Sequence, residues 1–112
     1  MSVDLDSLHH YCRIHGLSEA VLDEEARALI YTTAVPRFLD LLASFGMPAT
    51  FFVIGEDAGA PWAISALRWA HEKGMELGNH SYSHPYALAR LSATEVEQEV
   101  RRGGEAVARI TG

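Results

Sequence analysis

The spacing of apolar residues along the chain predicts helices that alternate with short strands. Between positions 31 and 45 the apolar residues recur at helical spacing, and Gly46 follows as a helix-ending residue. Positions 49–54 form a run of β-branched and aromatic residues, which is typical of a strand buried on both faces. Pro61 to Lys73 predicts a second helix, because a proline stands in its first turn and a glycine follows its last.

The rest of the chain extends this alternation. An initial strand is expected near Val3, and residues 75–78 predict another short strand. Residues 92–95 have the spacing of a capping box and begin a third helix that ends near Ile110. The glycine pair at 103–104 interrupts the apolar stripe of this helix and weakens it.

Strands that alternate with helices imply right-handed βαβ units and a parallel sheet. The expected fold is therefore α/β, with about three βα units in a single domain that spans residues 1–112. One long acidic stretch, residues 7–30, has no clear place in this pattern. Within it, residues 23–27 predict a short solvated helix.

Composition narrows the function classes. The formal net charge is −6 and no cluster of lysine or arginine occurs, so nucleic acid and anionic membranes are poor candidates for partners. The single cysteine, Cys12, cannot form an intramolecular disulfide. Neither a signal peptide nor an apolar run of membrane-spanning length is present, and a cytoplasmic protein is expected. A leader removed from the natural protein would leave the same pattern.

The candidate chemistry follows the first and third strands. Asp4 and Asp6 come at the end of the first strand, and His80 and His84 follow the third. Because the carboxyl ends of parallel strands meet at one face, these side chains are expected to converge. Two histidines at i, i+4 on one helical turn can direct both imidazoles at one ion, and two histidines with one carboxylate leave coordination positions open. On spacing alone a structural role stays open, since such pairs also arise by chance.

Three segments resemble the polysaccharide deacetylase family, whose catalytic unit is the NodB homology domain and which is similar to carbohydrate esterase family 4. Pro48 to Gly55 resembles the second strand of the family. Glu76 to Pro85, with the sequence ELGNHSYSHP, resembles its histidine motif, and the helix that begins at Ser92 resembles the next family segment. The resemblance covers residues 31–112 and the short aspartate segment. It implies the N-terminal part of a distorted (β/α) barrel about twice this length.

The same resemblance implies a divalent metal, usually zinc, held by one aspartate and two histidines. Asp6, His80 and His84 would be these ligands, and Asp4 would be the catalytic base. Cobalt, nickel or iron would accept the same ligand set. The common family motif Thr-Phe-Asp-Asp-Gly is replaced here by Val-Asp-Leu-Asp-Ser, so the roles of the two aspartates remain open to exchange. The Asp-x-Asp form resembles a branch that acts on peptidoglycan or small cyclic amides.

Several other residues are weaker candidates. Ser81 is interpreted as a residue that orients a histidine, not as a nucleophile, and Tyr82 and Tyr86 are candidate substrate contacts. For the remaining residues a structural role or simple exposure is the first interpretation: loop histidines His9, His10 and His15, His71 on a helix, turn residues Glu56 and Asp57, Trp62 and Trp69 on a packing face, and the thiol of Cys12.

Three functions stay open at this point. The resemblance implies N-deacetylation of a carbohydrate, and the alternatives are hydrolysis of a small cyclic amide or other non-sugar N-acyl compound, or a catalytically silent metal-binding module. The base-orienting arginine and the late catalytic histidine of the family are not found in residues 1–112 and are expected further along. Because three strands leave two open sheet edges, a C-terminal half or another chain is expected to complete the sheet.

Overall fold

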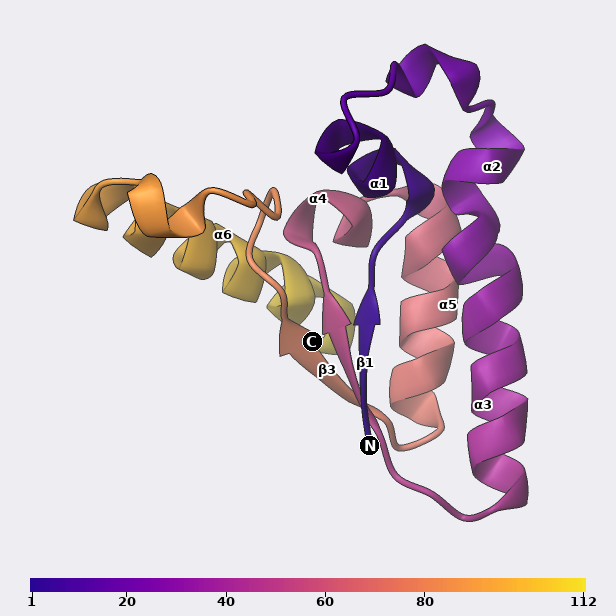
Figure 1. Ribbon diagram of the computed structural model, residues 1–112. Helices are drawn as coiled ribbons and strands as arrows, with labels where there is room; N and C mark the ends of the chain where they lie inside the picture. The colour runs from indigo at the N-terminus through magenta and orange to yellow at the C-terminus, as the bar shows by residue number, and fades with distance from the viewer.

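The computed structural model describes residues 1–112 and shows one parallel sheet with helices packed around it (Figure 1). The strands are β1 (Ser2–Leu5), β2 (Thr50–Val53) and β3 (Glu76–Asn79). They lie in the order β1-β2-β3, and both neighbouring pairs are parallel. The α/β class and the parallel sheet predicted from the sequence are confirmed.

The helices fall close to their predicted places. Those expected at 31–45, 61–73 and 92–110 and the strands expected at 49–54 and 75–78 are all present, with ends shifted by a few residues. The helical elements are α1 (Leu8–Ile14), α2 (Glu24–Leu29), α3 (Val35–Ser44), α4 (Gly55–Ala58), α5 (Pro61–Glu72) and α6 (Ala93–Thr111), with 3-10 turns at Glu19–Val21 and Leu88–Arg90 and a π turn at Ile30–Ala34.

The acidic stretch, which had no predicted place, is largely helical. It contains α1 and α2, and α2 continues through the π turn into α3 as one long rod (Figure 1). Asp23 begins this rod by accepting a hydrogen bond from the Ala26 N–H. Pro36 has no N–H to donate to the preceding turn, and the wider π turn accommodates that loss. The predicted helix start at residue 31 was therefore too late.

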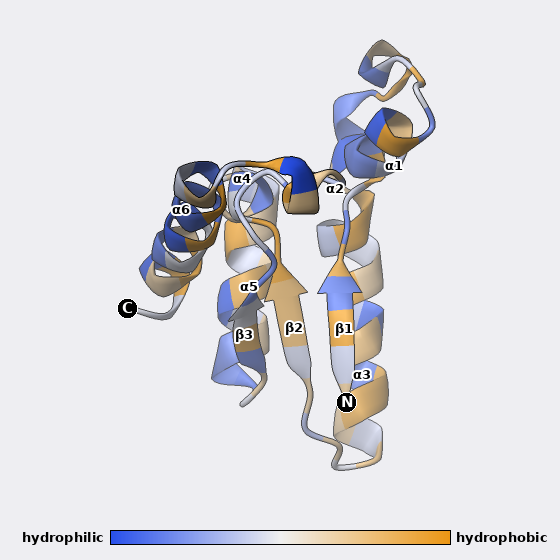
Figure 2. Cartoon of the chain, turned by 60° about the vertical axis from the view of Figure 1, so that its left-hand side comes forward, coloured by the Kyte–Doolittle hydropathy of each residue, from blue (hydrophilic) through white to orange (hydrophobic).

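The core lies between the sheet and the helices α3 and α5. Hydrophobic residues concentrate on β2 and on the sides of these helices, whereas α6 is mostly hydrophilic (Figure 2). Trp62 packs on the buried Tyr31 with ring centroids 5.2 Å apart, and Trp69 also packs against the core, so their predicted packing role is confirmed. The most deeply buried core residues include Val35, Leu42, Phe51, Val53 and Leu67.

Strand β2 is not buried on both faces, contrary to expectation. Phe51 and Val53 are buried, but Thr50 and Phe52 on the other face are only half-buried. The register places Asp4 opposite Phe52 on that second face. The strand therefore separates a packed face from an accessible one, and the accessible face carries an ionisable side chain at its edge.

Helix α6 is unbroken despite its two adjacent glycines. The predicted capping box is formed, since the Ser92 hydroxyl and the Glu95 carboxylate each bond the other residue's backbone N–H. A Cβ on Gly103 would lie 2.2 Å from Asn79 Oδ1 and 2.7 Å from the Ser81 carbonyl carbon. This glycine therefore lets α6 approach the segment after β3 closely, and the helix continues through the glycine pair. None of the helices combines the length and apolarity needed to cross a bilayer.

Candidate metal centre

Asp6, His80 and His84 converge at the carboxyl ends of β1 and β3. Asp6 Oδ1 lies 3.6 Å from His80 Nε2 and 3.8 Å from His84 Nε2, and the two imidazole centroids are 4.6 Å apart. The His80 N–H donates to the Val53 carbonyl at 3.0 Å, which carries the parallel pairing one residue beyond β3. The structure thus brings together the three side chains that the sequence suggested as ligands.

The geometry and burial of these donors fit a divalent cation. Asp6 Oδ1 is buried without a hydrogen-bond partner, an unfavourable state for a carboxylate oxygen that a bound cation relieves. A tetrahedral site with bonds of about 2.0–2.1 Å has donor atoms roughly 3.3–3.4 Å apart, slightly less than the distances between Asp6 and the two histidines. Two imidazoles and one carboxylate also leave room for a water molecule or substrate oxygen.

The two histidines do not lie on a helical turn, contrary to prediction. The segment after β3 is an irregular loop in which Ser81 (φ 60°) and His84 (φ 53°) adopt left-handed backbone conformations. The carboxylate of Glu99 on α6 accepts hydrogen bonds from the N–H groups of Tyr82 (3.1 Å) and Ser83 (2.8 Å). Left-handed conformations are unfavourable for residues with a Cβ, so contacts such as these are needed to hold the loop.

The other candidate residues of this loop, Ser81, Tyr82 and Tyr86, make different contacts. The Ser81 hydroxyl accepts from the His84 N–H at 3.2 Å, so it contacts the main chain of a ligand and not its ring. The Tyr82 ring stacks beneath the Arg102 guanidinium at 3.6 Å and so belongs to the contact with α6. Tyr86 is 56% exposed, and its ring stands perpendicular to that of His84 at 4.7 Å. Tyr86 is therefore the tyrosine placed beside the candidate metal site.

Asp4 lies on β1, and Asp6 is the first residue after that strand. Both line a pocket of about 170 Å³, together with Tyr11 of α1. Burial lowers the pKa of His84, and the nearby carboxylates of Asp6 and then Asp4 partly oppose this shift. Tyr11 was not identified from the sequence, because α1 was not predicted.

A second polar group lies next to the candidate metal ligands. This group, the buried cluster, consists of Ser7, His9, His10 and Asp57. His10 and Asp57 are 1% and 2% exposed, so the interpretation of His9 and His10 as solvated loop residues was wrong. The Ser7 hydroxyl donates to Asp57 Oδ2 at 2.7 Å and lies 3.0 Å from His9 Nδ1. Burial, and next the adjacent His10, lower the pKa of His9.

The buried cluster touches the metal ligands at one place. The His10 ring meets that of His84 edge-on with centroids 5.9 Å apart. Asp57 lies in the first turn of α4, and its carboxylate is buried. The predicted turn role describes the position of its main chain and does not explain why its carboxylate is buried. The other weak candidates do not lie in either group: His15 and His71 are exposed, Glu56 pairs with Arg13 at 3.0 Å, and Cys12 is a buried free thiol.

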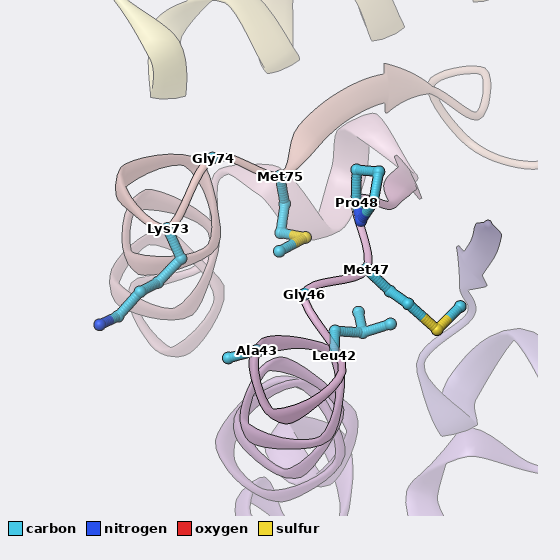
Figure 3. Close-up of a pocket in the computed structure, with 8 residues that line it drawn as sticks. All are labelled: Leu42, Ala43, Gly46, Met47, Pro48, Lys73, Gly74 and Met75. Carbon is cyan, nitrogen blue, oxygen red and sulfur yellow. The ribbon is translucent and has the colours of Figure 1, made fainter.

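A larger pocket, of about 270 Å³, lies at the opposite end of the sheet (Figure 3). It sits where the chain enters β2 and β3, between the end of α3 and the end of α5. Lys73 is the one ionisable residue among those that line it. In (β/α) barrels this amino-terminal end contributes stability, and the pocket offers no metal-ligating side chain. Its lining residues are Leu42, Ala43, Gly46, Met47, Pro48, Lys73, Gly74 and Met75.

The fold and the site together define an α/β protein with one aspartate and two histidines at the carboxyl end of a parallel sheet. The profile of the polysaccharide deacetylase family matches residues 23–112, and the chain belongs to this family. Asp4, Asp6 and the two histidines of the buried cluster precede the matched region. The resemblance seen in the strand and histidine motifs is thereby confirmed.

Individual relatives agree with this assignment. Peptidoglycan-N-acetylglucosamine deacetylase of Bacillus cereus is 36% identical over 77 residues, which cover 69% of this chain and 27% of that protein. Chitooligosaccharide deacetylase of Rhizobium leguminosarum bv. phaseoli is 31% identical over 104 residues, covering 86% and 43%. A match to peptidoglycan deacetylase of Helicobacter pylori is 24% identical and covers 98% of this chain and 36% of that protein.

Two solved structures share the fold. The Xyl-CE4 domain of a multidomain xylanase from the hindgut metagenome of Trinervitermes trinervoides has a TM-score of 0.65 at 29% identity, over 71% of this chain and 38% of that one. Peptidoglycan deacetylase PdaC of Bacillus subtilis, as a D285S mutant, has a TM-score of 0.62 at 33% identity, over 70% and 37%. The chain spans less than half of each of these relatives and structures, and the three-stranded sheet corresponds to part of a (β/α) barrel.

Proposed function

We propose that the protein containing this chain is a metal-dependent hydrolase that removes N-acetyl groups from a carbohydrate. The observation that carries the proposal is the convergence of Asp6, His80 and His84 around a buried carboxylate oxygen that has no hydrogen-bond partner. This arrangement occurs in a chain of the polysaccharide deacetylase family, at the end of the sheet where parallel α/β folds build their sites.

Each residue of the site has its own role in the proposed reaction. Asp6, His80 and His84 would hold the cation, zinc by preference, which when bound supplies a Lewis acid and lowers the pKa of water towards neutrality. Asp4 is exposed and lines the same pocket as Asp6, and its carboxylate would accept a proton as the catalytic base. Ser81 and Glu99 would hold the histidine loop in its bent conformation through their hydrogen bonds.

The aromatic residues at the edge of the site suit a sugar. Tyr86 is 56% exposed and Tyr11 is 50% exposed. Partial burial is the main cause that raises the pKa of Tyr86, and Asp6 and Tyr11 raise it further. A tyrosine offers an apolar ring face and a hydroxyl, which together match the C–H faces and hydroxyls of a pyranose. The names of the relatives specify peptidoglycan and chitooligosaccharide. An N-acetylhexosamine oligomer is therefore the substrate class we propose.

The test is acetate release by the full-length protein from N-acetylated chitooligosaccharides and from peptidoglycan. We expect chelation to abolish release and added zinc to restore it. His80→Ala and Asp6→Ala should lose both metal and activity. Asp4→Asn should retain the metal and lose at least about a hundred-fold in kcat, in the range of general acid–base contributions.

The matched control is His71→Ala, which removes an exposed histidine from α5 and should leave activity unchanged. Full activity in the presence of chelator, or in Asp6→Ala, would contradict the proposal. Failure of the metal-loaded protein to release acetate from any of these substrates would contradict the carbohydrate part of the proposal.

A further inference from the structure

We propose that the buried cluster of Ser7, His9, His10 and Asp57 holds a second divalent cation, with Asp57 and the Nε2 atoms of both histidines as its ligands. These three residues each offer a donor atom, all within 4.8 Å of one another, and all three residues are buried. None of them belongs to the Asp6 centre. The cluster joins α1 and the residue before it to α4, and the two helices lie side by side at one end of the sheet (Figure 1).

The first argument is charge. The carboxylate of Asp57 is 2% exposed and accepts a hydrogen bond from Ser7. The groups nearest to it that can carry a positive charge are the imidazoles of His9 and His10. Arg13, on the same helix as these histidines, pairs instead with Glu19 and Glu56 on the surface. A buried carboxylate without a cationic partner is strongly destabilising, so this position favours a bound positive charge.

The second argument is the direction of the hydrogen bonds. The Ser7 hydroxyl has one proton, and it donates that proton to Asp57 Oδ2. The Ser7 hydroxyl oxygen must then accept from His9 Nδ1 at 3.0 Å, which makes Nδ1 the protonated nitrogen of that ring. In the neutral ring, His9 Nε2 consequently presents a lone pair to Asp57 Oδ1 at 3.5 Å. Two electron-rich atoms face each other, and a cation between them would remove the repulsion.

The third argument is distance. His9 Nε2 and His10 Nε2 each lie 3.5 Å from an oxygen of Asp57. Charge-assisted hydrogen bonds are shorter, at about 2.7–2.9 Å, so these gaps are too long for a protonated imidazole bound directly to the carboxylate. They are close to the spacing of roughly 3.3–3.4 Å between the ligands of a tetrahedral zinc ion. His10 Nε2 is fully buried and has no hydrogen-bond partner, so it too is free to act as a metal ligand.

The consequence is a second ion of a different kind. The three ligands of the Asp6 centre are partly exposed, whereas the three ligands of the buried cluster are all buried. A cation there would fix α1 against α4, and through the edge contact between His10 and His84 it would support the position of one Asp6-site ligand. This role does not depend on deacetylase activity.

The test is the zinc content of the full-length protein, measured by elemental analysis after expression with zinc and removal of loosely bound metal. We expect two ions per chain in the native protein, one in His80→Ala and one in Asp57→Asn. The double variant should hold none, and the control His71→Ala should hold two. Because Asp57→Asn also replaces a buried carboxylate with an amide in the hydrogen-bond network of Ser7, His9→Gln in the His80→Ala background serves as a second variant and should lower the content from one to none.

The outcomes separate cleanly. A native protein with a single ion that disappears in His80→Ala would overturn the proposal and identify the buried cluster as a hydrogen-bonded network only. Retention of the last ion when either Asp57→Asn or His9→Gln is added to His80→Ala would overturn it as well. Absence of deacetylase activity would bear only on the proposed function, because the ion count is independent of turnover.

Discussion

The contact between Gly103 and the histidine loop makes the metal site sensitive to a single methyl group on α6. A Cβ at this position would lie 2.2 Å from Asn79 Oδ1, 2.7 Å from the Ser81 carbonyl carbon and 2.8 Å from its oxygen. Asn79 could move its side chain, although this would break its hydrogen bond to the Val100 carbonyl at 2.8 Å. A shift of the Ser81 backbone would disturb His80, which precedes it, and His84, whose N–H donates to the Ser81 hydroxyl.

The size of the effect follows from these distances. An ordinary contact of a Cβ begins near 3.4 Å, so α6 and the loop must separate by about 0.7 Å at the Ser81 carbonyl carbon. Overpacking of this kind costs about 1–3 kcal/mol, while alanine in place of glycine returns up to about 1 kcal/mol of helix propensity. We expect Gly103→Ala to lower the free energy of unfolding by about 1–2 kcal/mol and to weaken zinc binding at least tenfold.

Gly104→Ala is the matched control, because a Cβ there meets only Asn79 Nδ2 at 3.7 Å, an ordinary contact. This variant should be as stable as the native protein or more so, with unchanged zinc affinity. The assays are denaturant unfolding and zinc competition against a chromophoric chelator, run on both variants of the full-length protein. If Gly103→Ala matched Gly104→Ala in both measurements, the inference that close packing of α6 shapes the site would be refuted.

Three further predictions concern neighbouring groups. Glu99→Ala removes the acceptor that holds the histidine loop and should weaken zinc binding about 10–100-fold in the same zinc competition. The control Glu97→Ala, on the exposed face of α6, should leave zinc binding unchanged. Burial lowers the pKa values of His9 and His84, so the metal-free unfolded state binds more protons near pH 6.5. Stability should therefore be constant above about pH 7 and fall as the pH drops through about 6.5, and urea unfolding in which stability rises on acidification would contradict this. Tyr86→Ala should raise KM for a chitooligosaccharide and leave zinc content unchanged.

Much of the fold could be predicted because its strongest signals are local. The run at 49–54, the two glycine-terminated helices and the capping box at Ser92 each identify an element without knowledge of the rest. The candidate metal ligands could be predicted for a related reason. Side chains that follow parallel strands must gather at one end of the sheet, so the two aspartates and the two histidines could be grouped from the order of the strands. The choice of Asp6 as the ligand came from the family resemblance.

The misses have a common physical cause, which is long-range packing. Gly103 resembles a helix breaker by its local sequence, and its value becomes visible only when the loop after β3 lies against it. By its local sequence His10 resembles a solvated loop residue. Its burial follows from the packing of α1 beside α4, which brings His10 to Asp57, 47 positions further along the chain. The bent conformation of the histidine loop likewise depends on Glu99, whose role no spacing rule in the sequence indicates.

The central claim is that Asp6, His80 and His84 bind one divalent ion. An anomalous difference map at the zinc edge, from crystals of the zinc-loaded full-length protein, tests it most directly. The prediction is a peak bonded to Asp6 Oδ1 and to the Nε2 atoms of both histidines, at about 2.0–2.1 Å. An anomalous map with no peak among these three side chains in fully loaded crystals would contradict the claim.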